Sequence, residues 1–200
     1  MAFSMIYKTD LTDRDLSGFW KRLEGAGRTD NLFYDRAPVS AGEFAWIARD
    51  PAFHLWMVSY LGEPAGIFFL TDVQGKAGRA HFAILPTGGR RFEICGRSEA
   101  ADGRTALRIP LAVGLAGFCL SQSLWRRTKS GGFVLDSLIG ITPVCFLPAL
   151  KLAKRMPYAS ECVVPDFAFI RETGENAAAR IAVYRRDEGA GGIQESWRNW

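Results

Sequence analysis

The chain has 200 residues and a mass of 22.1 kDa, which fits one compact domain and excludes a second large one. Hydrophobic residues make up 48% of the chain and charged residues 23%, so an intrinsically disordered protein is excluded. The 25 Lys and Arg exceed the 21 Asp and Glu by four, but the basic residues are spread along the chain. A nucleic-acid-binding protein would need one basic face, which this distribution does not indicate.

The cysteines argue against a metal centre. Cys95, Cys119, Cys145 and Cys162 are too far apart to form a CxxC pair, so we expect reduced, mostly packing residues and no bound metal. The N-terminus lacks the basic stretch and apolar run of a secretory signal. The longest apolar run, 109–120, is shorter than the ~20 residues of a membrane helix. We therefore expect a cytoplasmic protein without membrane contact.

The first half of the chain predicts a strand, two helices and three more strands. The strand covers 5–8, and Thr12 or Asp13 can cap the first helix. The second helix covers 40–49 and ends before Pro51. Turn sequences then separate three strands of an antiparallel meander, at 54–61, 65–71 and 79–85.

The last strand of this meander alternates between two kinds of side chain. Its two faces consist of Ala80, Phe82 and Ile84 on one side, and of Arg79, His81, Ala83 and Leu85 on the other. The second face is polar enough to serve a functional site.

The second half predicts three helices and three strands. Residues 1–186 are expected to form one domain, and the Gly-rich segment 187–200 a flexible tail. The expected helices cover 90–100, 111–125 and 147–156, and the expected strands 133–142, 158–170 and 180–185.

Two stretches carry a family resemblance. Leu138–Pro143 and the helix Ala149–Tyr158, with its closing turn Arg155-Met156-Pro157-Tyr158, resemble the fifth strand and following helix of the GNAT superfamily of acyl-CoA-dependent N-acyltransferases. The resemblance implies an α+β fold with a mixed, largely antiparallel sheet of six to seven strands flanked by helices. It implies transfer of an acetyl or other acyl group from acyl-CoA to an amine, without a metal. A homodimer would be compatible with it.

In this superfamily, the pantetheine arm of CoA pairs with strand backbone where two parallel strands splay apart. By the resemblance, Phe82, Ala83, Ile84 and Leu85 would contact it. The family's phosphate loop, Q/R-x-x-G-x-G/A, is absent, and the nearest substitute is Gly88, Gly89, Arg90 and Arg91, where glycines admit a phosphate and arginines pair with it. An ordinary Gly-Gly turn with solvated arginines explains the same residues. Ala101–Arg104 is a weaker candidate, because Asp102 would repel a phosphate.

The family's catalytic Asn and Tyr positions fall near Phe146 and on Ala153, and neither residue can move a proton. Other relatives use a histidine, a carboxylate or water on the central strands. That leaves His81, a neutral imidazole, and Asp136, expected inside an apolar strand. A hydrogen-bonded sheet histidine and a paired carboxylate are the structural alternatives. The functional alternative is a GNAT-fold protein without transfer activity that acts as a binding or interaction module.

Overall fold

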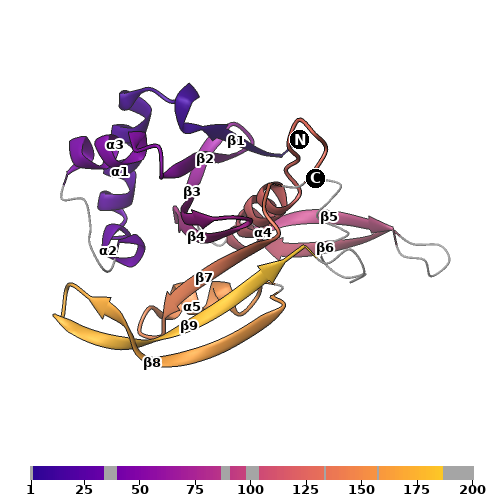
Figure 1. The fold of residues 1–200 in the computed structure, drawn as a ribbon. Coiled ribbons are helices and arrows are strands. Elements are labelled where there is room, and N and C mark those ends of the chain that lie inside the picture. Colours follow the sequence, from indigo (N-terminus) through magenta and orange to yellow (C-terminus); the bar gives the residue numbers. More distant parts are fainter. Residues whose placement is uncertain are drawn as a thin grey trace.

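The computed structural model describes residues 2–33, 40–86, 91–97, 104–132, 134–156 and 158–186. They form an α+β fold with one large sheet (Figure 1). The strands are β1 (Phe3–Tyr7), β2 (His54–Tyr60), β3 (Glu63–Gln74), β4 (Ala77–Ile84), β5 (Arg91–Arg97), β6 (Arg104–Pro110), β7 (Ser137–Pro143), β8 (Ser160–Ile170) and β9 (Glu175–Arg185). The helices are the 3-10 turn η1 (Lys8–Asp10), α1 (Asp13–Gly25), α2 (Thr29–Leu32), α3 (Ala41–Arg49), α4 (Leu111–Leu124) and α5 (Leu147–Ala153).

The large sheet has seven strands in the order β1-β2-β3-β4-β7-β9-β8. Its neighbours pair in antiparallel fashion, except that β4 and β7 are parallel. This mixed, largely antiparallel sheet confirms the predicted fold class. The single parallel pair lies in the middle of the sheet, and it is also where the sheet opens.

Local sequence explains where the first helices begin. The Thr12 hydroxyl accepts the Asp15 backbone N–H at 3.2 Å, and the Asp15 carboxylate accepts the Thr12 N–H at 2.8 Å. This reciprocal capping box fixes the start of α1. The Ser40 hydroxyl accepts the Glu43 N–H at the start of α3 in the same way. Both helix starts agree with the sequence prediction.

Helices cover both faces of the sheet (Figure 1). On one face, α1 and α3 bury Leu16, Phe44 and their neighbours against inward residues of β2 and β3. On the other face, α4 packs against alternate residues of the same strands, together with Leu138 and Tyr184. Nearly all of α4 is buried, which explains why its sequence is apolar on every side.

One predicted element is wrong. Residues 91–97 form strand β5 rather than part of a helix over 90–100, and β5 pairs with β6 as a separate two-stranded hairpin. The run Phe92-Glu93-Ile94 is short and gives no reliable helical period, whereas the partner strand 104–110 supplies a hydrogen-bonded ladder that the local pattern cannot reveal. The local sequence pattern therefore does not predict this hairpin between β4 and α4.

Other expectations agree with the structure at the level of whole elements. Helix 111–125 is α4, helix 147–156 is α5, and the last two strands form the hairpin β8–β9. Strand β7 begins at Ser137 rather than at 133. The expected tail, 187–200, lies outside the described residues. Within the described part, the chain contains no helix with the length and hydropathy needed to cross a membrane.

Candidate active site

The central feature is a separation of β4 from β7. The two strands pair from Ala77 with Ser137 to Ala80 with Gly140, and the ladder stops there. Beyond this point β4 continues to pair with β3 on its other side, and β7 with β9. In the described structure, no strand therefore pairs with the facing edges of His81–Ile84 and Ile141–Pro143. An extended ligand with amide groups can hydrogen-bond to such edges.

Two neighbouring cavities follow this separation, and together they are called the groove below. The first, of about 100 Å³, lies where the strands part, and the second, of about 210 Å³, continues toward Pro86 and Ala112. They share lining residues, including Phe82, Phe146 and Ala149. Small side chains keep the first cavity open: Ala80, Ala116, Gly140, Ala149 and Ala153.

The groove ends near the start of α4, since Ala112 lines it. The residue before the helix is Pro110, and it provides no side-chain cap for the first-turn N–H groups. Arg28 lines the same part of the groove, and its buried Nε has no hydrogen-bond partner among the described residues. A helix N-terminus beside an arginine attracts phosphate groups. Sequence reasoning missed Arg28, because it lies before α2, far from β4 in the chain.

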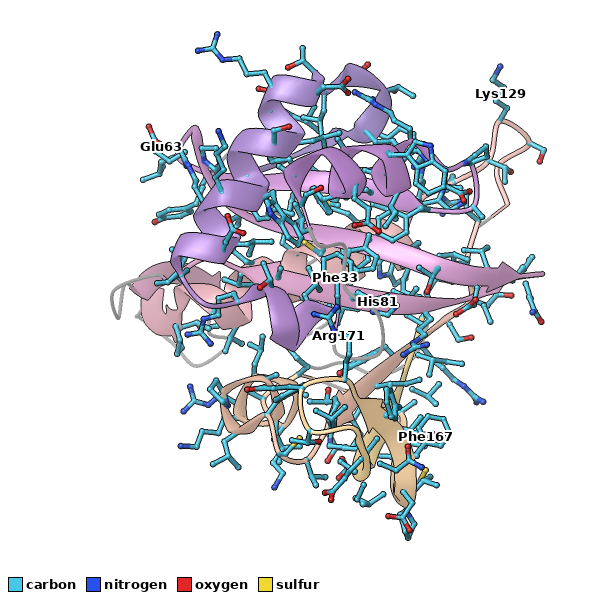
Figure 2. All side chains as sticks on the ribbon, turned by 90° about the vertical axis from the view of Figure 1, so that its left-hand side faces the viewer. Phe33, Glu63, His81, Lys129, Phe167 and Arg171 are labelled. Carbon is cyan, nitrogen blue, oxygen red and sulfur yellow. The ribbon has the colours of Figure 1, made fainter. Side chains whose placement is uncertain are left out.

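A larger cavity of about 440 Å³ lies on the α1–α3 face of the sheet. Phe33 and His81 both line it, and Figure 2 shows them close together on this side of the molecule. Trp46, 75% exposed, forms part of its rim. Among the described lining residues, the carboxylates of Glu43, Asp50 and Asp72 outnumber one basic side chain, Arg79.

His81 lies between the large cavity and the groove, since it lines both. Its ring stacks on Phe69 with centroids 4.5 Å apart. Burial lowers the pKa of His81 to about 3, and the charge of Arg79 acts in the same direction. The imidazole is therefore neutral at pH 7 and is a much weaker base than the ordinary histidine that the sequence suggested.

A short hydrogen-bond chain orients the imidazole. The Thr71 hydroxyl lies 2.9 Å from Nε2 of His81 and donates to the Asp72 carboxylate at 3.3 Å. When the single hydroxyl proton is directed at Asp72, Thr71 accepts from Nε2–H of His81. In that tautomer Nδ1 of His81 carries the lone pair and can accept a hydrogen bond.

Asp136 lies at the opposite end of the β4–β7 pair from the separation. It precedes Ser137, the first paired residue of β7, and lies outside that strand. Arg186 donates to its carboxylate at 2.6 Å, and Lys76 lies 3.6 Å away. The hydrogen bond from Arg186 is the main cause that lowers the pKa of Asp136. The structure does not bring Asp136 together with His81, because Asp136 lines neither the groove nor the large cavity.

The predicted CoA contacts are placed only in part. Phe82, Ala83, Ile84 and Leu85 line the groove. Gly88, Gly89 and Arg90 lie outside the described residues, and Arg91 begins β5. All eight residues therefore remain predicted CoA contacts, four of them at the groove.

Metal and thiol chemistry find no support in the described residues. No group of three or more His, Cys, Asp or Glu side chains there could hold a metal ion. Cys119 is buried in the core, and burial raises the pKa of its thiol. A buried neutral thiol is a poor nucleophile, and the exposed Cys145 and Cys162 line none of the three cavities described above. His81, by contrast, lines both the large cavity and the groove.

The protein is similar to known proteins in structure but matches none of them in sequence. No protein-family model matches the chain, and no curated protein matches it by sequence. Its structure is similar to the acetyltransferase from Salmonella typhimurium that modifies the N-terminal serine of ribosomal protein L7/L12, with a TM-score of 0.65 and 9% identity over 94% of this chain and 96% of that one.

Two further matches were solved with ligands. The spermidine N-acetyltransferase from Vibrio cholerae, in complex with CoA and spermine, has a TM-score of 0.62 and 14% identity over 98% of both chains. The microcin C7 self-immunity acetyltransferase, in complex with acetyl-CoA and AMP, has a TM-score of 0.61 and 10% identity over 92% of this chain and 93% of that one. The protein thus has the fold of the GNAT acetyltransferases, as the sequence resemblance predicts.

Proposed function

We propose that the protein transfers an acyl group, with acetyl the first candidate, from acyl-CoA to an amine. The observation that carries this proposal is the groove that begins where β4 and β7 separate and ends near the start of α4. Such a groove suits an extended chain of amides with a thioester at one end and phosphates at the other. The structural matches are to acetyltransferases, and the two described above with ligands have CoA or acetyl-CoA bound.

The residues present fit CoA in three respects. The small side chains around Gly140 leave room for a narrow ligand, and the unpaired strand edges offer backbone donors and acceptors. Arg28 and the uncapped start of α4 supply positive charge at the far end. Arg90 and Arg91 would add to that charge. These groups would bind and orient the thioester of acyl-CoA. The bond that reacts is the carbon–sulfur bond of that thioester.

The large cavity supports an amine as the acceptor. Carboxylates predominate among its described charged residues, so it favours a cation over an anion. An amine must lose its extra proton before it attacks a thioester. Neutral His81 would accept a hydrogen bond from the attacking nitrogen at Nδ1, with Thr71 holding the ring in place. Because its pKa is about 3, His81 would pass the proton to water rather than keep it.

The test is release of free CoA thiol from acetyl-CoA in the presence of a panel of amines. Ala149→Trp fills the groove where its two cavities meet, and Lys151→Trp adds the same side chain at an exposed position of the same helix. We expect thiol release from the wild type and the Lys151 variant, and at least tenfold less from the Ala149 variant. Equal activity of both variants would place the reaction elsewhere. CoA binding without transfer to any amine would favour a binding module.

A further inference from the structure

Tyr184, on β9, faces the groove from the side of the sheet opposite His81. It lines the cavity where the strands separate, and it belongs to the core cluster under α4. It pairs with Leu138, two residues before Gly140. Its side chain is 5% exposed. The sequence alone predicts 180–185 only as a strand and indicates no role for Tyr184.

The ring of Tyr184 is held directly over Gly140. A Cβ atom added to Gly140 would lie 3.1 Å from Cε2 of Tyr184 and 3.7 Å from its hydroxyl oxygen. Gly140 is the last residue of β7 that pairs with β4. The absence of a side chain there lets the phenol reach the point where the strands part, which explains a glycine inside this strand.

A buried cation lies beside this phenol. Arg180, 2% exposed, donates through Nε to Glu161, and its Cζ lies 4.6 Å from the centre of the Tyr158 ring. Nη1 and Nη2 of Arg180 have no hydrogen-bond partner of good geometry among the described residues. Burial raises the pKa of Tyr184, whereas Arg180 is close enough to lower it. A guanidinium in this position would stabilise a tyrosinate.

We propose that Tyr184 donates its phenolic proton to the CoA sulfur that leaves during acyl transfer. The inference rests on the proposed function. It assigns a residue to the departure of CoA, the part of the reaction that follows attack by the amine. The family's tyrosine position is Ala153, which lines the same cavity. Tyr184 therefore places a hydroxyl in the cavity from a different element, β9.

Every bond and proton of the acyl transfer is accounted for. The amine nitrogen bonds to the thioester carbonyl carbon, and its proton leaves through His81 to water. The carbon–sulfur bond breaks, and its electron pair stays on sulfur. The Tyr184 O–H gives its proton to that sulfur, and Arg180 stabilises the tyrosinate until water returns a proton. The products are the amide and CoA with a free thiol.

The experiment compares wild type, Tyr184→Phe and Tyr60→Phe. Both changes remove one tyrosine hydroxyl from a side chain of the core cluster under α4 or packed against it, but Tyr60 lines neither the groove nor the large cavity. We expect Tyr184→Phe to lower kcat by ~10², as loss of a general acid does, with the Kd for CoA unchanged. Tyr60→Phe should keep the wild-type kcat. A Tyr184→Phe kcat within about threefold of wild type would overturn the inference while leaving the proposed function intact.

A second experiment needs no amine acceptor, because it measures the pKa of the thiol of bound CoA. The ionisation of bound CoA can be followed by the ultraviolet absorbance of its thiolate. If the Tyr184 hydroxyl hydrogen-bonds to this sulfur, the thiolate is stabilised, and the pKa of the bound thiol is lower in wild type than in Tyr184→Phe. Identical thiol pKa values in the two proteins would overturn the inference. A wild type that binds no CoA would instead defeat the proposed function and the inference with it.

Discussion

His81 and Tyr184 lie on opposite faces of the sheet at the point where β4 and β7 separate. His81 stacks on Phe69, whose core cluster lies under α1 and α3, whereas Tyr184 belongs to the cluster under α4. Both side chains line the cavity at the separation. A thioester held there would have a proton acceptor on the amine side and a proton donor on the sulfur side.

The activity of His81 variants tests whether His81 accepts the proton of the attacking amine. His81→Ala should lower kcat by ~10², the lower end of general-base effects, because the base is weak. The Kd for CoA should stay within twofold to threefold of wild type, since loss of binding is not expected of a group that acts on the amine. Steady-state kinetics and calorimetry measure the two quantities. An unchanged kcat would reject the assignment.

The low pKa of His81 also predicts how stability depends on pH. The folded pKa is about 3 and the unfolded one about 6.5, so the unfolded chain binds more protons between these values. The contribution to stability is complete above pH 6.5 and decreases as pH falls toward 3, by about 1.4 kcal/mol per unit. His81→Gln, which keeps a polar group near Thr71, should have a shallower slope. Urea unfolding of both proteins at pH 7, 6 and 5 measures the difference, and parallel slopes would contradict the lowered pKa.

The carboxylates of the large cavity should select cationic acceptors. Asp72→Asn removes one charge and keeps a residue that tolerates the positive φ of 50° found there. We expect the KM for a cationic amine to rise about fivefold, equivalent to roughly 1 kcal/mol for a charge near the surface. Asp166→Asn is the matched control, because Asp166 has a φ of 49° and does not line the cavity. Equal KM values for the two variants would remove Asp72 from the acceptor site.

Arginines at the far end of the groove should bind the phosphates of CoA. Arg28→Ala should weaken CoA binding about tenfold, as expected for the loss of one charge-assisted hydrogen bond. Replacement of Arg90 and Arg91 together by Ala should weaken the free energy of CoA binding by ~2–4 kcal/mol, because two charge-assisted hydrogen bonds are lost. Arg22→Ala, at an exposed position of α1, is the control. Unaltered affinity in both arginine variants would move the search to Arg104 and Arg108.

Asp136 should affect stability rather than turnover. Its carboxylate joins the start of β7 to Arg186, after the end of β9. Its pKa is lowered, so its contribution to stability is present above the unfolded value near 3.9 and lost as pH falls through the folded value. Asp136→Asn should therefore lower the Tm at pH 7. A large loss of kcat with an unchanged Tm would restore Asp136 as a catalytic candidate.

Local patterns were sufficient to predict much of the fold. Thr12 and Ser40 mark helix starts through their own hydroxyls, and alternation placed His81 and Phe82 on opposite faces of one strand. The hairpin β5–β6 was missed because pairing between 91–97 and 104–110 is not a local property. The site was predicted less fully for a related reason. Tyr184 and Arg28 reach the groove only through the sheet order and the packing of α2, which one sequence without structure does not reveal.

Calorimetric titration of the wild type with CoA and acetyl-CoA tests the central claim most directly, because every step proposed here requires that complex. We predict binding with a micromolar Kd and a loss of at least tenfold in Ala149→Trp but not in Lys151→Trp. No binding of either ligand up to millimolar concentration would contradict the account, and the GNAT fold would then serve another function.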